Sequence, residues 1–269
     1  MRSGCEVRSG GCVKKIHPTA IVHPDAVLGE DVEVGPWAII AGTVKIGART
    51  KVGPRVTIEG HTTIGEDNEI FTGAVVGSLT QDKKADGGVS YLKIGDRNTI
   101  REYATLNPGT LNGTETVVGN DNLLMAYAHV AHDCIIHNGA TLANNATLAG
   151  HVIVEDKAIL GGLSAVHQFV RVGKLSITGG CSKVVQDVPP FMMIDGHPAH
   201  AFGINAVGLD RAGFSLEEKS AIKKAFKIIF KSGLILKNVI KQLRQDMPSS
   251  PSIQTIIDFL EKSERGICK

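Results

Sequence analysis

Aliphatic residues recur at every sixth position of this chain, from Ile16 to Val184. Of the 29 positions in this series, 25 are Ile, Val or Leu, and the other four are Asp82, Gly88, Asn112 and Thr178. A helix repeats every 3.6 residues and an ordinary strand every two, so neither produces this pattern over such a length. A short fixed repeat is typical of a solenoid.

The repeating unit is an aliphatic residue, often a glycine, two polar residues, a small residue and a variable one, as in Ile64–Glu69. Because alternate strand residues share a face, the aliphatic residue and the small residue two positions before it point into one narrow interior. The intervening Gly, Asp and Asn residues suit tight corners. Three units make a triangular coil, and successive coils stack as parallel strands about 4.8 Å apart. The pattern predicts a mainly β protein with a parallel β-helix over residues 15–190.

Two polar interruptions keep the six-residue register. They cover residues at about 77–92 and about 107–117, and both contain glycines and other turn-forming residues. We expect each to be a loop ejected from the coil, where functional residues often lie on a rigid scaffold.

The pattern changes after Pro189 and Pro190, which end the strand ladder. The stretch from Ser215 to Glu218 is a capping box, and apolar residues at helical spacing follow it. A later helix should begin at Pro251, because proline suits a first helical position. We expect residues 191–269 to form a C-terminal α-helical domain that caps the solenoid, and residues 1–14 to be a disordered extension without a signal peptide.

Composition narrows the class of protein. The formal net charge of +2 argues against a nucleic-acid-binding protein. The five cysteines are scattered without a CxxC pair, which favours reduced thiols and a cytoplasmic location. No apolar run is long enough for a membrane span, so we expect no integral membrane segment.

Histidines gather near one corner when residues 18 apart are stacked. On this rule His132 lies beneath Gly150, and Asp133 lies beneath His151. The four imidazoles brought near one another are His129, His132, His151 and His167. Such a cluster has three interpretations: a zinc site, a general base whose tautomer is held by the adjacent carboxylate, or solvated polar surface. The residues alone leave all three open.

The segment Asp121–Cys134 resembles the active-site segment of the UDP-N-acetylglucosamine O-acyltransferase family. The similarity covers residues 15 to 265, and its further matching stretches are Leu142–His151, Ala165–Phe169, Gly179–Ser182, Gln186–Pro190 and Phe202–Asn205. The resemblance implies a left-handed coil, although the general crossover rule favours the right hand. It also implies a homotrimer with active sites between subunits.

The resemblance further implies an activity in lipid A biosynthesis. A 3-hydroxyacyl chain would pass from acyl carrier protein to the 3-hydroxyl of UDP-N-acetylglucosamine, without a cofactor or a metal ion. His132 would be the general base, Asp133 would orient it, and the Gly150 N–H would stabilise the oxyanion.

Residues that match the family's substrate contacts are carried over in the same way. Gly180 and Ile177 would line the acyl groove, and a glycine there leaves room for a long chain. The implied sugar-nucleotide contacts are Gln81, Asp82, Lys84, His129, His151, His167, Gln168, Asn205 and Arg211. Val207 and Ala212 depart from the family pattern, which weakens the inference about the nucleotide end.

Other activities fit the same repeat. They are another hexapeptide acyltransferase that N-acylates an amino sugar, a γ-type zinc carbonic anhydrase, and a non-catalytic scaffold. A lysine-rich stretch from Lys219 to Arg244 suits an acidic partner such as acyl carrier protein.

Overall fold

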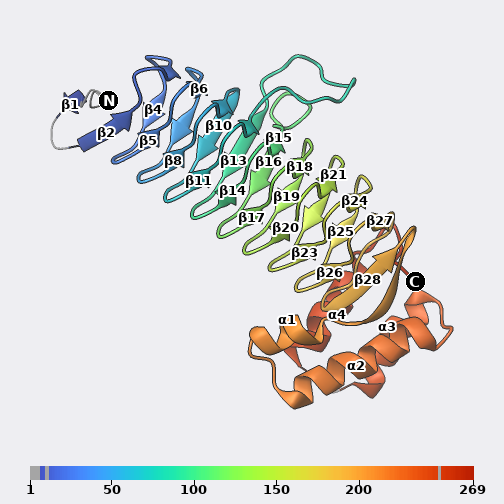
Figure 1. The fold of residues 1–269 in the computed structure, drawn as a ribbon. Helices are drawn as coiled ribbons and strands as arrows, with labels where there is room; N and C mark the ends of the chain where they lie inside the picture. The colour runs from blue at the N-terminus through green and yellow to red at the C-terminus, as the bar shows by residue number, and fades with distance from the viewer. Residues whose placement is uncertain (1–6, 10–11, 248–249) are drawn as a thin grey trace.

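The chain folds as a left-handed parallel β-helix with α-helices at its C-terminal end (Figure 1). The structure is a computed structural model, and it describes residues 7–9, 12–247 and 250–269. The hexads form three sheets of 12, 8 and 9 strands, one on each side of the coil. The predicted fold class is confirmed.

The 12-stranded sheet begins with β1 (Val7–Ser9) and β2 (Cys12–Ile16) and ends with β28 (Met192–Gly196) and β29 (Ala199–Ile204). Between them lie β5 (Glu33–Val34), β8 (Lys51–Val52), β11 (Glu69–Ile70), β14 (Thr99–Ile100), β17 (Leu123–Leu124), β20 (Thr141–Leu142), β23 (Ile159–Leu160) and β26 (Ile177–Thr178).

The 8-stranded sheet contains β4 (Val27–Leu28), β7 (Lys45–Ile46), β10 (His61–Ile64), β13 (Tyr91–Ile94), β16 (Glu115–Val118), β19 (Ile135–Ile136), β22 (Ile153–Val154) and β25 (Arg171–Val172). The 9-stranded sheet contains β3 (Ile21–Val22), β6 (Ile39–Ile40), β9 (Thr57–Ile58), β12 (Val75–Val76), β15 (Thr105–Leu106), β18 (His129–Val130), β21 (Thr147–Leu148), β24 (Ala165–Val166) and β27 (Lys183–Val184).

Strand pairing confirms the stacking of residues 18 apart, as in the parallel pair of His129 with Thr147. The two loops lengthen this offset. Ile64 pairs with Ile94, and Ile94 pairs with Val118, so the loops add two hexads and then one. Whole hexads preserve the register, which is why the interruptions did not shift the aliphatic series.

The loops are shorter than the sequence suggested. Residues 77–90 connect β12 to β13, and residues 107–114 connect β15 to β16. Leu92 and Thr116 fall within the expected loops, but they are buried and pair with each other in neighbouring strands. Their alternation of exposed and buried residues extends these strands to four residues.

Buried asparagines support the middle of the coil. Asn98 donates to the Oδ1 of Asn68 at 3.0 Å and to the carbonyl of Gly119 at 2.9 Å, while its own Oδ1 accepts from the N–H of Asn122. The Oδ1 of Asn122 in turn accepts from the N–H of Ala140. Because each amide satisfies backbone groups of the next coil, these polar side chains can occupy an otherwise aliphatic interior.

The C-terminal region is more than a helical domain. β28 continues the first sheet in parallel with β26 and turns back antiparallel into β29, a hairpin that the sequence did not reveal. The helices are α1 (Ala206–Arg211), α2 (Leu216–Lys231), α3 (Leu236–Asp246) and α4 (Pro251–Glu261). Ser215 forms the expected capping box with Glu218, but α1 was not foreseen.

The end of the chain is tied to the last coils. The carboxylate of Asp187 accepts from the N–H of Arg171 at 2.8 Å and from the hydroxyl of Ser263 at 2.7 Å. The second of these contacts joins residues 76 positions apart in sequence. None of the helices in the described part of the chain has the length and apolar character needed to cross a membrane.

The N-terminal extension differs from the expectation of disorder where it is described. β1 pairs antiparallel with β2, with Val7 opposite Lys14. Residues 1–6, 10 and 11, which belong to the same predicted extension, lie outside the described residues.

The asparagine ladder predicts a measurable loss of stability on truncation. Asn98→Ala removes the acceptor for the buried Asn122 N–H and one donor to the Gly119 carbonyl. It should lower the free energy of unfolding by about 2–3 kcal/mol in chemical denaturation. The control is Asn138→Ala, since Asn138 also bridges two coils but is exposed, so water can replace it. Equal losses in the two variants would contradict this role for the ladder.

Candidate active site

The candidate site lies at one corner of the coil. Asp133, His151 and Phe169 occupy successive layers of this corner with φ angles of 58°, 60° and 66°, the left-handed conformation that turns the chain between strands. The N–H of His151 donates to the carbonyl of His132 at 3.0 Å, and that of Phe169 to the carbonyl of Gly150 at 3.1 Å. The backbone ladder therefore fixes the side chains above one another.

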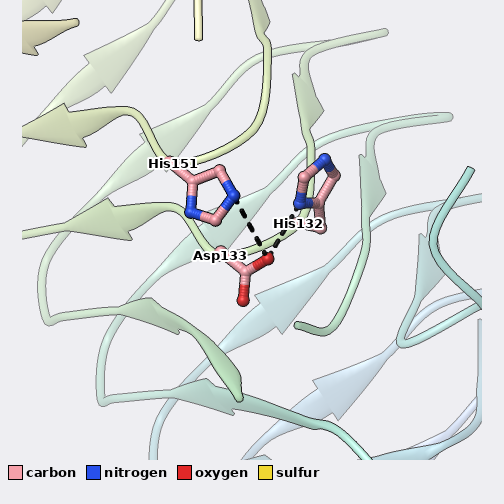
Figure 2. A group of neighbouring side chains, drawn as sticks. All are labelled: His132, Asp133 and His151. Atoms are coloured by element: carbon pink, nitrogen blue, oxygen red, sulfur yellow. Dashed lines mark hydrogen bonds and ion pairs between the residues drawn. The ribbon is translucent and has the colours of Figure 1, made fainter. Parts of the chain in front are cut away.

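His132 and Asp133 form a hydrogen-bonded pair. The Nδ1 of His132 lies 2.8 Å from the Oδ2 of Asp133, and both side chains are largely buried. Figure 2 shows the same carboxylate oxygen facing the ring of His151, whose Nε2 is 3.8 Å away. Phe169 stacks on the His151 ring at a centroid distance of 4.6 Å and so restrains its orientation.

The environment keeps Asp133 ionised. Burial opposes the charge, but hydrogen bonds from His132, Thr114 and Thr110 outweigh it and hold the pKa of this carboxyl below its ordinary value. The backbone N–H of Thr110 lies 3.2 Å from its Oδ2. The second loop thus supplies a donor to the pair, a role that sequence reasoning missed.

Gly150 packs directly against the His132 ring. A Cβ on Gly150 would lie 2.4 Å from the His132 Nε2 and 2.3 Å from its Cε1, so only glycine allows this approach. Among the described residues, the Gly150 N–H donates no hydrogen bond within the chain. The residue packed against the Cε1 and Nε2 atoms of the imidazole therefore has an unused backbone donor.

The first loop reaches the same imidazole from 50 positions earlier in the sequence. The Oδ2 of Asp82 lies 3.4 Å from the Nε2 of His132. The Oδ1 of Asp82 accepts from the N–H of Lys84 at 2.9 Å, which closes the loop tip into a turn. Gln81 and Lys84 are exposed beside it.

The other two histidines of the predicted cluster, His129 and His167, do not take part in the His132–Asp133 hydrogen bond. The Nδ1 of His129 is 2.7 Å from the hydroxyl of Thr105, and burial, followed by the charge of His132, lowers the pKa of His129. His167 lies two coils further along and is exposed, with its Nδ1 3.2 Å from the carbonyl of Gln168. Gln168 is also exposed.

Two predicted nucleotide contacts are not beside His132 within one chain. Asn205 is buried, caps α1 by accepting from the Gly208 N–H, and donates to the carbonyl of Leu175 at 2.9 Å. Leu175 lies at a different corner of the coil, which is formed in earlier layers by Gly139 and Lys157. Arg211 is exposed at the last residue of α1.

The two predicted acyl-chain residues also lie away from the His132 corner. Gly180 is exposed next to the third corner, where Cys181 has a φ angle of 58°. Ile177 is half-buried on the outer face of β26.

A cleft of about 540 Å³ extends from the His151 corner toward the end of the chain. Its apolar wall is formed by Ile153 and Phe169, and its far side by Lys262 and Arg265. Asp187 also lines it, and burial raises the pKa of this carboxyl despite its hydrogen bonds. The stack of corner positions could have identified Phe169, but no sequence signal links residues 262–265 to the site.

The arrangement offers two kinds of chemistry. An imidazole that is hydrogen-bonded to a carboxylate and packed against a glycine with an unused N–H suits proton transfer with stabilisation of an oxyanion. The donor atoms of His132, Asp133 and His151 also lie within 4.8 Å of one another, close enough to share an ion.

Comparison with known proteins identifies the family. Residues 187–268 match the second domain of UDP N-acetylglucosamine O-acyltransferase, and residues 115–150 match the bacterial transferase hexapeptide repeat. The acyl-[acyl-carrier-protein]–UDP-N-acetylglucosamine O-acyltransferase of Verminephrobacter eiseniae is 48% identical over 96% of this chain and 100% of its own length. The protein of the same name from a Janthinobacterium species is 50% identical over 94% of this chain and 99% of its own length.

Solved structures agree with these relatives. LpxA from Acinetobacter baumannii superposes with a TM-score of 0.90 at 44% identity, covering 94% of this chain and 99% of that one. LpxA of Bacteroides fragilis, a UDP-N-acetylglucosamine acyltransferase, gives a TM-score of 0.91 at 42% identity over the same shares. The chain therefore belongs to the UDP-N-acetylglucosamine O-acyltransferase family.

Proposed function

We propose that this enzyme transfers a 3-hydroxyacyl chain from acyl carrier protein to the 3-hydroxyl of UDP-N-acetylglucosamine, in lipid A biosynthesis in the cytoplasm. His132 is the general base in this proposal. The observation that carries it is the His132–Asp133 pair, with a 2.8 Å contact at Nδ1, packed against Gly150, whose backbone N–H is unused.

The ionised carboxylate selects the tautomer of His132. Because Asp133 is held in its charged form, it can only accept a hydrogen bond, so the Nδ1 of His132 carries the proton. The Nε2 is then left with its lone pair, which a general base requires. His132 uses this nitrogen to take the proton of the sugar hydroxyl.

The acyl-transfer step follows from these positions. As His132 removes the proton, the sugar oxygen attacks the thioester carbonyl and the carbonyl oxygen becomes an oxyanion. The N–H of Gly150 is the donor to that oxygen, a contact typically worth about 3 kcal/mol of barrier. The C–S bond then breaks, and the thiolate leaves with the proton held by His132, so an ester is formed and the imidazole returns to its neutral form.

Asp82 belongs to the acceptor side of this mechanism. Its carboxylate faces the Nε2 of His132 at 3.4 Å, the place that the sugar hydroxyl must reach. We assign Asp82, with Gln81 and Lys84 on the same exposed loop, to binding of the sugar. His129, His151, His167 and Gln168 are assigned to the sugar nucleotide on the neighbouring layers.

We further propose a homotrimer whose sites lie between subunits. The support comes from two residues expected to bind the nucleotide. Asn205 donates to the carbonyl of Leu175, at a corner other than that of His132, and Arg211 follows it on α1. A second subunit can supply them through a head-to-tail ring contact.

We assign the binding site of the acyl donor, acyl carrier protein, to the C-terminal end of the coil. The cleft beside His151 is also lined by Lys262 and Arg265, near the end of the chain. The exposed lysines of α2 and α3 are Lys223, Lys224, Lys227, Lys231, Lys237 and Lys241. The positive charge of these lysines suits the approach of an acidic carrier protein.

Loss of the base should separate catalysis from folding. His132→Ala should lower kcat about 10²–10⁴-fold, in an assay with 3-hydroxyacyl carrier proteins and UDP-N-acetylglucosamine, while thermal melting and oligomeric state stay unchanged. His137→Ala is the matched control, since His137 is an exposed histidine on the same coil and should keep full activity. If His132→Ala retained most of the activity, the assignment of His132 as the general base would be wrong.

The same assay tests the acceptor. The amino-substituted sugar nucleotide, which would give an amide, is the competing substrate. Turnover of that analogue alone would favour the N-acyltransferase alternative, whereas turnover of neither sugar would contradict the proposed function as a whole.

Gly180 should set the acyl-chain length. It is exposed, and the nearest atom to an added Cβ is the Gly162 carbonyl oxygen at 3.4 Å, so a larger side chain fits without disturbing the coil. Gly180→Met should shift the kcat/KM preference from long to short 3-hydroxyacyl donors at least about tenfold. An unchanged preference, with activity intact, would place the end of the acyl groove elsewhere.

A further inference from the structure

We propose that His132, Asp133 and His151 form an inhibitory binding site for Zn²⁺ or a similar divalent transition-metal ion. The ion is not a cofactor here. It occupies the groups that would otherwise transfer the proton, so the inhibitory part of this proposal rests on the proposed function, whereas binding of the ion does not.

The three donors have the chemistry and spacing that zinc prefers. Zinc binds imidazole nitrogen and carboxylate oxygen at about 2.0–2.2 Å, so two ligands of a tetrahedral ion lie about 3.3 Å apart. The Oδ2 of Asp133 is 2.8 Å from the His132 Nδ1 and 3.8 Å from the His151 Nε2. Movements of less than about 1 Å bring the three atoms onto one ion.

The donors are held in place by the fold. Asp133 and His151 are successive corner residues, and their backbone conformations are set by the stacked coils. Phe169 restrains the ring of His151 by stacking, and Thr110 and His132 restrain the carboxylate. A site that is already assembled binds an ion without the cost of ordering its ligands.

The site is also accessible from solvent. The side chain of His151 is 41% exposed, whereas those of His132 and Asp133 are 13% and 10% exposed. An ion can therefore enter on the His151 side and find the other two ligands at the base of the corner. Three protein ligands leave the fourth position of a tetrahedral zinc ion for water.

Binding of the ion is incompatible with the assigned chemistry. Zinc takes the Nδ1 lone pair of His132, so the neutral ring changes tautomer: Nδ1 loses its proton, Nε2 gains one, and the hydrogen bond to Asp133 is lost. The Nε2 then carries the ring proton and has no lone pair with which to take the proton of the sugar hydroxyl. Acyl transfer should stop while the ion is bound.

The experiment measures binding of the metal alone to the full-length protein. Co²⁺ is the probe, because tetrahedral Co²⁺ absorbs visible light much more strongly than the hydrated ion. We expect one Co²⁺ per chain, displaced by an equivalent of Zn²⁺. Either His132→Ala or His151→Phe should weaken binding by more than the roughly 10–100-fold that loss of an outer-shell partner costs.

The matched control is His23→Ala. The Nδ1 of His23 lies 3.7 Å from a carboxylate oxygen of Asp25, so this exposed pair resembles the site but offers only two donors. His23→Ala should keep the Co²⁺ spectrum and its stoichiometry. Thermal melting without metal shows whether each variant is folded, and Asp133→Asn provides a second variant if His151→Phe is not.

The outcomes separate this proposal from the assigned activity. Stoichiometric binding in wild type that persists in His132→Ala and His151→Phe would overturn it, as would no binding at all. Inhibition of acyl transfer should follow the same Zn²⁺ concentration dependence as displacement of Co²⁺, and binding without inhibition would also overturn it. An enzyme inactive in metal-free buffer would instead count against the proposed function.

Discussion

The backbone hydrogen bonds between successive coils are the constraint on which the rest of the structure depends. Successive coils exchange bonds at nearly fixed positions: the His129 N–H donates forward to the Ala146 carbonyl, and at the corner the His151 N–H donates back to the His132 carbonyl. This ladder decides which side chains become neighbours, so residues from separate hexads meet without a tertiary core of the usual kind. The thin interior is filled by one aliphatic and one small residue from each hexad, with asparagines where the backbone needs partners.

The site depends on this rigidity in a specific way. His132 and Asp133 are adjacent in sequence, and adjacent side chains point in different directions in an extended strand. At a left-handed corner the chain turns, which lets the Asp133 carboxylate face the Nδ1 of its neighbour. The coil above then places Gly150 against the other side of the ring. The same geometry explains why the corner could serve either proton transfer or capture of a metal ion.

Much of the fold and part of the site could be predicted from the sequence. The period of six identified the coil, and the 18-residue offset correctly stacked Asp133 beneath His151. The offset failed to place Thr105, because the second loop changes its spacing from His129 to 24 residues. It could not place Asp82 and Thr110, because both lie within the loops and outside the paired strands. The hairpin of β28 and β29 was missed because its sequence lies outside the hexad series. Contacts of residues 262–265 depend on how the helices pack, for which one sequence carries no periodic signal.

The state of one nitrogen tests the central claim most directly. ¹⁵N NMR of histidine-labelled enzyme reports which ring nitrogen of His132 carries the proton at neutral pH, with His132→Ala used to assign the signals. The account predicts a protonated Nδ1 and an unprotonated Nε2, because the ionised Asp133 can only accept from Nδ1. A proton on Nε2 with a bare Nδ1 would contradict it, since the ring could then neither donate to Asp133 nor take the proton of the acceptor.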